Sequence, residues 1–222
     1  MEDTTKKKKR EPRKAAGARR GLCQSFEFAA RSIGFSNVAG IDEAGRGPLA
    51  GPVVAAAVIL PTECTSMVIN DSKKMTAKQR DRLYDQILEC AVAAKIESVG
   101  VVLVDRLNIY RATLLAMKQA VEGLAVRPDF IYIDGPAGIE VDIPQKPLVD
   151  GDALCFSVAA ASVLAKVSRD RQMVEFDELY PGYGFSKHKG YGTRDHLEAL
   201  RQLGPSPIHR RSFAPVKELM NR

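Results

Sequence analysis

The chain has 222 residues, which is enough for one large domain or two small ones with a sizeable hydrophobic core. Hydrophobic residues make up 45% and charged residues 27%, as is typical of globular proteins, and no apolar run reaches the ~20 residues of a membrane span. No apolar stretch follows the basic N-terminus either. We therefore expect neither an integral membrane protein nor a secretory signal peptide.

The positive charge of the chain lies at its N-terminus. Residues 1–20 hold nine Lys or Arg and three acids, a net charge of +6, which equals the net charge of the whole chain. The totals of 33 basic and 27 acidic residues thus leave 24 of each in residues 21–222. We expect 1–20 to be a disordered basic tail that attracts phosphate nonspecifically, and 21–222 to be the folded domain.

The predicted elements alternate between strands and helices. The apolar run 53–60 is typical of a central strand buried on both faces, and we expect it to pair antiparallel with the strand before it. This alternation predicts an α/β fold with a mixed sheet. In chain order, we expect a helix near 26–33, strands over 38–41 and 53–60, a helix over 76–94, a strand over 96–103, a helix over 107–124, strands over 130–133 and 146–149, and helices over 157–179 and near 195–203.

The cysteines indicate a reducing compartment, such as the cytoplasm. They are widely spaced and include no Cys-x-x-Cys pair, which argues against a zinc site and predicts free thiols. The four are Cys23, Cys64, Cys90 and Cys155.

Acidic residues follow three of the predicted strands directly. Asp42 and Glu43 end the first, Asp134 follows the strand at 130–133, and Asp152 follows a weaker one. Carboxylates brought together at strand ends repel one another unless a cation compensates them, and an all-oxygen set selects Mg²⁺ or Mn²⁺. Adjacent strand residues point to opposite faces, so Asp42 and Glu43 share a site only if the strand ends or bulges, which Gly45 allows.

Each of these acids also has a plainer interpretation, as a turn residue or a salt-bridge partner. For Asp134 alone, which precedes a glycine, the turn is the better interpretation. For the whole set the metal site is favoured, because ordinary turns do not explain an Asp-Glu pair beside a Gly-Arg-Gly loop. We expect His188 and His196 to be structural residues rather than metal ligands.

Glycines and basic residues suggest contacts to phosphate. In Gly45-Arg46-Gly47 the glycines allow backbone N–H groups to approach an anion closely, and the arginine is a bidentate phosphate donor. The alternative interpretation of this triplet is a tight hairpin turn. Lys73, Lys74 and Lys189 add basic groups in other loops. Tyr191 can stack on a sugar or base, or it can pack in the core, and residue type alone favours neither.

These residues lie in segments that resemble bacterial ribonuclease HII, the type 2 ribonuclease H family. The segments occur in the order of the family and span about residues 37–217. They are 41–60 (Ile-Asp-Glu-Ala-Gly-Arg-Gly-Pro onwards), Asp71-Ser-Lys-Lys74, Ile133-Asp-Gly135, Gly151-Asp152, 159–170 (Ala-Ala-Ala-Ser-Val-Leu-Ala-Lys-Val-Ser-Arg-Asp), 183–193 (Tyr-Gly-Phe-Ser-Lys-His-Lys-Gly-Tyr-Gly-Thr) and His209-Arg-Arg-Ser-Phe213.

The resemblance implies an RNase H-like fold, with a mixed central sheet flanked by helices and a C-terminal helical segment. It implies a Mg²⁺- or Mn²⁺-dependent endonuclease that cuts the RNA strand of RNA–DNA hybrids and incises 5′ to single ribonucleotides in duplex DNA. The partner would be that nucleic acid, with no membrane, and the chain is expected to act as a monomer. Arg46 and the short tail distinguish it from the sister ribonuclease HIII, which usually has Gly-Lys-Gly and a folded N-terminal extension.

The resemblance also assigns roles to residues. The Gly-Arg-Gly motif of the family, which reads the ribonucleotide 2′-hydroxyl at the RNA–DNA junction, falls on 45–47, and its junction-sensing tyrosine falls on Tyr191. Its catalytic metal ligands fall on Asp42, Glu43, Asp134 and Asp152. With two metal ions, we expect Asp42 to bridge both, Glu43 and Asp134 to hold one and Asp152 the other, giving 3′-hydroxyl and 5′-phosphate ends.

Two other classes of protein compete with this interpretation. A noncatalytic nucleic-acid-binding protein accounts for the basic tail and loops, but it gives no reason for acids where phosphate approaches. A Mg²⁺-dependent phosphatase for small molecules accounts for the acids, but not for the dispersed basic loops.

Overall fold

The structure is a computed structural model that describes residues 22–64, 69 and 75–220. The expected basic tail at 1–20 and the candidate residues Lys73 and Lys74 therefore lie outside the described residues.

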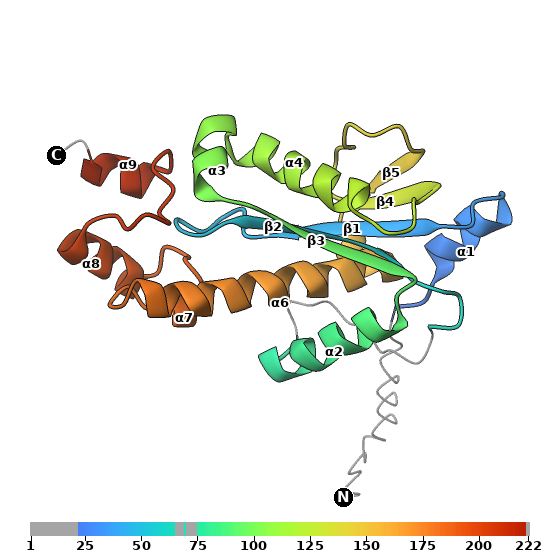
Figure 1. Ribbon diagram of the computed structural model, residues 1–222, viewed down its shortest axis with the longest axis horizontal. Helices are drawn as coiled ribbons and strands as arrows, with labels where there is room; N and C mark the ends of the chain where they lie inside the picture. Colours follow the sequence, from blue (N-terminus) through green and yellow to red (C-terminus); the bar gives the residue numbers. More distant parts are fainter. Residues whose placement is uncertain (1–21, 65–68, 70–74, 221–222) are drawn as a thin grey trace, which may run out of the picture.

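A five-stranded mixed sheet forms the centre of the described fold (Figure 1). The central strand β1 pairs antiparallel with β2 on one side and parallel with β4 on the other, which confirms the expected mixed sheet. Across the sheet the strands are β3 (Ala93–Val99), β2 (Val53–Ile59), β1 (Val38–Ala44), β4 (Phe130–Asp134) and β5 (Gln145–Leu148).

Helices cover both faces of this sheet (Figure 1). On one face lie α3 (Val101–Leu107) and α4 (Ile109–Glu122), and on the other lie α2 (Ala77–Cys90) and the long α6 (Phe156–Leu179). The C-terminal helices gather at one end of the molecule, left in Figure 1. The remaining helices are α1 (Ser25–Ser32), α5 (Gly151–Leu154), α7 (Phe185–His188), α8 (Arg194–Leu203) and α9 (Ala214–Met220).

The hydrophobic core has one layer on each face of the sheet. Alternate residues of β2 contribute to the two layers, so this strand is fully buried, as its uninterrupted apolar run predicts. One layer packs under α4 and the other under α6 and α2. Among the described residues, no helix has both the length and the apolar character that a membrane span requires.

Helix α6 lies unusually close to β1 because both elements carry small residues where they meet. A Cβ atom added to Gly40 would lie 2.1 Å from the backbone carbon of Ser157. The buried alanines 159–161 follow on the same helix. This close packing places the first half of α6 beside Asp42, two residues beyond Gly40 on β1, where the Ser162 side chain forms a hydrogen bond with the carboxyl.

The structure differs from the sequence prediction at residues 100–108. The expected strand over 96–103 is instead β3, which ends at Val99, followed by α3, whose N-cap is Gly100. The valines of α3 do not extend the sheet: Val104 is buried whereas Val102 is 78% exposed. The position of Gly100 and the packing of Val104 therefore override the strand preference of valine. The next helix begins at Ile109, capped by the Asn108 side chain, which accepts a hydrogen bond from the Arg111 N–H.

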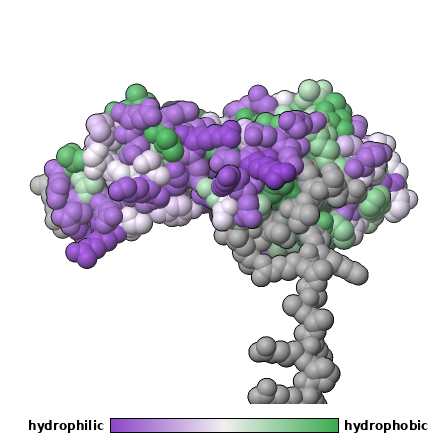
Figure 2. Space-filling view, turned by 90° about the horizontal axis from the view of Figure 1, so that it is seen from below, coloured by the Kyte–Doolittle hydropathy of each residue, from purple (hydrophilic) through white to green (hydrophobic). Residues whose placement is uncertain are grey.

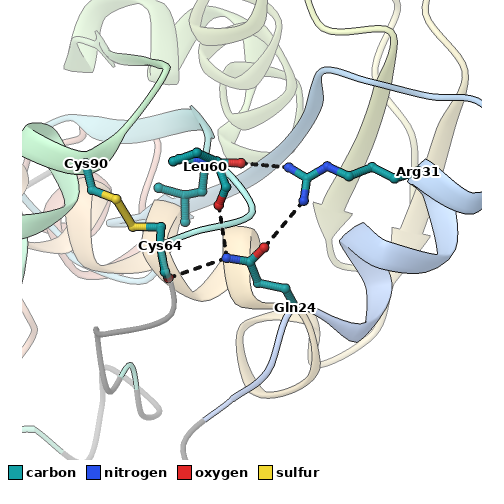
Figure 3. Close-up of a disulfide and its surroundings, with 6 residues drawn as sticks. Gln24, Arg31, Leu60, Cys64 and Cys90 are labelled. Carbon is teal, nitrogen blue, oxygen red and sulfur yellow. Dashed lines mark hydrogen bonds between the residues drawn. A yellow bond between two sulfur atoms is a disulfide. The ribbon is translucent and has the colours of Figure 1, made fainter.

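The expectation of four free thiols is wrong for two of them. Cys64, just after β2, forms a disulfide with Cys90, the last residue of α2, whereas Cys23 and Cys155 are free (Figure 3). The two partners are 26 residues apart in sequence, but α2 turns back so that their Cα atoms lie 6.5 Å apart. Gln24 donates hydrogen bonds to the carbonyl oxygens of Pro61 and Cys64 and thus ties α1 to the same segment.

Candidate active site

Three carboxylates converge where β1 and β4 end. Asp42 and Glu43 belong to β1 and Asp134 is the last residue of β4. One oxygen from each of the three lies within 4.8 Å of the others. The two strands are parallel neighbours, so their ends share one edge of the sheet although the residues are about ninety positions apart.

The pairing of β1 explains how two adjacent residues reach one site. On the β2 side the ladder continues through Ala44, which is opposite Val54. On the β4 side the pairing stops at Ile41, opposite Ile133. The strand therefore ends on one side only. Beyond Ile41 its edge toward β4 is open, and both side chains can turn to that edge.

Burial and mutual repulsion make this cluster hard to ionise. Burial is the largest cause that raises the pKa of Asp42 well above its ordinary value, and the charges of Glu43 and Asp134 add to the effect. A hydrogen bond from the Ser162 side chain works in the opposite direction. Burial also raises the pKa of Glu43, against the opposing effect of Arg46. A group of this kind, made of oxygen ligands alone, suits a hard divalent cation.

Asp152 lies beside the cluster but is not one of its three converging carboxylates. It is buried in α5, and its backbone N–H lies 3.4 Å from Oδ1 of Asp134. The N–H of Gly151 donates to the same oxygen at 2.7 Å. The start of α5 thus orients the Asp134 carboxylate through backbone groups. Within the described chain, the mutually close carboxylate oxygens belong to Asp42, Glu43 and Asp134.

The carboxylates form one wall of a cavity of about 490 Å³. Tyr191 lines this cavity and is 45% exposed, which excludes the alternative that it packs in the core. Lys189 lines a smaller groove next to it, and Arg80 borders both. The cavity is lined by Asp42, Glu43, Asp134, the 44–47 loop, Arg80, Ser162, Lys166 and Tyr191.

A buried arginine holds the Gly-Arg-Gly loop in shape. Arg210 is fully buried, and no carboxylate is among the hydrogen-bond partners that the structure gives it. Its guanidinium donates instead to backbone carbonyls between Gly45 and Pro52, at distances such as 2.8 Å to Pro48 and 2.9 Å to Arg46. The shape of the loop therefore depends on a residue more than 150 positions later.

A second buried arginine explains why the first residue of the loop is a glycine. The Arg169 side chain lies so close that a Cβ atom on Gly45 would meet its Nε at 2.1 Å. Gly45 also has a φ of 98°, in the left-handed region that favours glycine. Arg169 donates to the carbonyls of Pro52, Ala50 and Lys189 at 3.0–3.1 Å, and so joins the loop to the segment that carries Tyr191.

The arginine of the loop contacts the acidic cluster. Arg46 Nη1 lies 3.1 Å from Oε1 of Glu43, with the arginine side chain half exposed. Lys166 is similarly paired with Asp170, at 2.7 Å one turn along α6. Acids and cations thus line the same cavity, an arrangement that can hold a metal ion and a phosphate together.

Sequence reasoning missed several lining residues and the two supporting arginines. Ser162, Lys166 and Arg169 recur at helical spacing along α6, which is the signal that places them on one face of that helix. Arg80 gives no such signal. Arg210 belongs to a basic run, and only its contacts with the 45–52 segment reveal that it is buried.

The face around α6, α7 and α8 is mainly polar. Figure 2 shows the molecule from below, with hydrophilic residues over most of the coloured surface in its left and central parts. Hydrophobic residues are more frequent toward the right of that view.

Comparisons with known proteins agree with this geometry. The chain is 58% identical over 188 residues to a ribonuclease HII of Desulfitobacterium hafniense strain Y51, a match that covers 85% of this chain and 72% of the relative. It is 54% identical over 195 residues to the ribonuclease HII of Enterococcus faecalis, covering 88% and 76%. The crystal structure of ribonuclease H2 from Pyrococcus horikoshii OT3 superimposes with a TM-score of 0.73 at 25% identity, covering 84% of this chain and 98% of the other. The sequence profile described as ribonuclease HII matches residues 39–216, and the chain therefore belongs to the ribonuclease HII family of RNase H endonucleases.

Proposed function

We propose that this ribonuclease H cuts the RNA strand of RNA–DNA hybrids and also incises on the 5′ side of a single ribonucleotide in duplex DNA. The products are a 3′-hydroxyl and a 5′-phosphate. The observation that carries the proposal is the meeting of three acids, the 45–47 loop and Tyr191 in one cavity. A noncatalytic binder would gain nothing from buried acids at the point where phosphate approaches.

The acidic cluster fits a divalent metal. Three oxygen ligands lie within 4.8 Å of one another, and burial raises the pKa of both Asp42 and Glu43 when no cation compensates their charge. Asp42, Glu43 and Asp134 would hold Mg²⁺ or Mn²⁺, with Asp152 as a fourth ligand when two ions bind. Such ions supply activation of water and neutralisation of charge on the phosphate and the leaving oxygen.

The side chains at the rim of the cavity position the scissile phosphate. Arg46, Arg80 and Lys166 line the same cavity as the acids and offer donors to phosphate oxygens. The in-line geometry of hydrolysis depends on this positioning, because the chain needs to supply no covalent nucleophile.

The loop at 45–47 selects the ribonucleotide through its donors. Its Gly45 and Arg46 carbonyls are turned to Arg210, so the loop reads the substrate through N–H groups and the Arg46 guanidinium. A deoxyribose lacks the 2′-hydroxyl that would pair with such a donor, and an unpaired donor costs about 1–3 kcal/mol. Tyr191 provides an exposed ring for stacking on the next sugar.

The test is a cleavage assay on three labelled duplexes: one with a single internal ribonucleotide, one uniform RNA–DNA hybrid and one of DNA alone. We expect cleavage of the first two with Mg²⁺ or Mn²⁺, and none with a chelator. Asp42→Asn should lower kcat by on the order of 10²–10³-fold, the loss that follows removal of an electrostatic stabiliser. Arg46→Ala should reduce the preference for the ribonucleotide junction by roughly tenfold, since one donor is lost.

Asp85→Asn is the matched control, because Asp85 is an exposed acid on α2 that does not line the cavity. It should cleave at the rate of the unmodified protein. Cleavage that persists in chelator, or an Asp42→Asn variant as fast as its parent, would contradict the metal site. Cutting of the hybrid without incision at a single ribonucleotide would contradict the finer specificity.

A further inference from the structure

All three histidines of the chain pack together beneath the segment that carries Tyr191. The rings of His188 and His196 stack at 4.3 Å, and His209 lies 5.2 Å from His196. His196 and His209 are buried. None of the three lines the cavity, so the proposed chemistry does not use them.

Hydrogen bonds fix which nitrogen of each ring carries the proton. The backbone N–H of Ser206 donates to Nδ1 of His209 at 2.9 Å, and the Ser206 hydroxyl lies 2.8 Å from the same nitrogen. Because Nδ1 accepts from the N–H, we assign the proton of His209 to Nε2. That Nε2 lies 3.0 Å from Nε2 of His196, which must accept and therefore carries its own proton on Nδ1. Nδ1 of His196 donates to the carbonyl of Tyr191 at 2.9 Å. A chain of donors thus runs from Ser206 to Tyr191.

The segment before and at Tyr191 is anchored at three successive carbonyls. Arg169 donates to the carbonyl of Lys189 at 3.0 Å, and the N–H of Leu49 donates to that of Gly190 at 2.8 Å. The third carbonyl, that of Tyr191, accepts from His196 and also from the N–H of Thr193 at 2.8 Å. Leu49 directly follows the Gly-Arg-Gly-Pro turn, so these bonds fix Tyr191 relative to the loop.

The result of this anchoring is a defined position for the Tyr191 ring. A Cβ atom on Gly47 would lie 3.6 Å from Cε1 of that ring, so the ring stands directly beside the last glycine of the loop. We infer that His196 and His209 are positioning residues that hold Tyr191 against the Gly-Arg-Gly loop for contact with the substrate. This inference rests on the role of Tyr191 in the proposed function.

Both histidines must stay neutral for this chain of donors to exist. A protonated His209 would carry hydrogen on both nitrogens, and Nδ1 could no longer accept from Ser206. Burial lowers the pKa of His209 to about 4 and also lowers the pKa of His196. The same bonds exclude a metal at this pair, because each of their four ring nitrogens already has a partner within the described residues.

Long-range ¹H–¹⁵N spectra of the full-length protein test the arrangement without an activity assay. At neutral pH we expect His196 to carry its proton on Nδ1, the less common tautomer, and His209 to carry its proton on Nε2. A proton on Nε2 of His196, or averaging between tautomers in both rings, would overturn the inference. Failure of the proposed function would leave this result unchanged.

A double-mutant cycle tests whether the histidines act through Tyr191. Loss of a stacking contact worth ~1–3 kcal/mol predicts that Tyr191→Ala raises KM roughly 5- to 150-fold with kcat less affected. His196→Leu should raise KM by a smaller factor than Tyr191→Ala does. In the Tyr191→Ala background the same substitution should raise KM by less than about twofold, since the contact of the tyrosine ring with substrate is already lost. Equal effects in both backgrounds would overturn the inference, because they indicate a general structural role.

A conservative variant and a matched control complete the test. Gln at position 209 can still donate from Nε2 to His196, whereas Leu cannot. His209→Gln should therefore keep KM and the His196 tautomer near those of the parent. His209→Leu should raise KM and should no longer hold His196 in the Nδ1-protonated form. Gln202→Leu makes the same kind of change on an exposed position of α8 and should leave KM unchanged. Equal loss in His209→Gln and His209→Leu would contradict the donor chain.

Discussion

At the scale of single residues, the acidic cluster that we expect to bind metal lowers the stability of the metal-free protein. Asp42 has a pKa raised above its ordinary value of 3.8, first by burial and then by Glu43 and Asp134. Below that ordinary value both the folded and the unfolded chain hold the proton. Above it the unfolded chain ionises freely, whereas the folded chain resists ionising a crowded, buried group. Stability without metal is therefore lost progressively as pH rises from the ordinary pKa to the raised one.

We therefore predict that Asp42→Asn stabilises the metal-free protein, and that this gain grows as pH rises above 3.8, the ordinary pKa of the carboxyl. The gain should be about 1.4 kcal/mol for every tenfold by which folding weakens the acidity of the Asp42 carboxyl. Mg²⁺ should stabilise the parent but have little effect on the variant. Urea unfolding in chelator or in Mg²⁺, at a series of pH values from 3.8 upwards, measures both effects. A difference between the proteins that does not change with pH would contradict this account.

At the scale of elements, the N-terminus of α6 donates hydrogen bonds to a carboxyl group from another helix. Glu27 of α1 is buried, and its Oε1 accepts hydrogen bonds from the N–H and hydroxyl of Ser157 at 2.7 and 2.6 Å. The first N–H groups of a helix have no partner within that helix and need acceptors, and the Glu27 carboxyl supplies one. Ser162 and Lys166 of the same helix line the cavity, so the position of α6 affects the geometry of the site.

Glu27→Ala should lower the free energy of unfolding by about 1–3 kcal/mol, because the buried donors of Ser157 lose their acceptor. Glu27→Gln should lose less, since the amide oxygen can still accept. Chemical denaturation of the three proteins checks the order. Equal stability of Glu27→Ala and the parent would mean that α6 does not depend on this contact.

The disulfide closes a loop of 26 residues between β2 and α2. Constraining a loop of this length in the unfolded chain predicts a contribution of about 3.5 kcal/mol. A reducing agent should therefore lower the stability of the parent, but not that of a Cys64→Ser/Cys90→Ser variant. The exposed Cys23 offers a control, since Cys23→Ser should keep the response. Four titratable thiols in the unreduced, unfolded protein would show that the bond does not form.

The sequence predicts the elements well where a local signal exists. The Thr76 cap of α2 and the buried run of β2 are both readable, and the strand-end acids follow from the strands. Contacts between distant segments leave no such signal. The pairing of Cys64 with Cys90 and the burial of Arg210 under the loop depend on tertiary packing. For the same reason, the sequence poses the question of how the adjacent residues Asp42 and Glu43 share one site, but only the strand pairing answers it.

At the scale of the whole molecule, charge is divided between two parts. Residues 21–222 carry no net charge, so we expect this part of the chain to attract nucleic acid through local groups such as Arg46, Arg80 and Lys166. The net charge of +6 in residues 1–20 adds attraction that does not depend on substrate sequence or on the 2′-hydroxyl. We therefore expect nonspecific affinity and selectivity for the ribonucleotide to come from different stretches of the chain.

Deleting residues 1–20 should weaken binding at low salt and leave kcat at saturating substrate unchanged. Each phosphate contact contributes a slope of about 0.9 to the dependence of log K on log salt, so a slope of up to about 5 should disappear with six net charges. Binding titrations of the Asp42→Asn protein, with and without the deletion, at 50 and 200 mM salt measure this slope without cleavage. Because attraction between net charge and phosphate distinguishes neither base nor sugar, we expect hybrid and DNA duplexes to lose affinity equally. A selective loss for the hybrid, or a fall in kcat, would instead place these residues in the site itself.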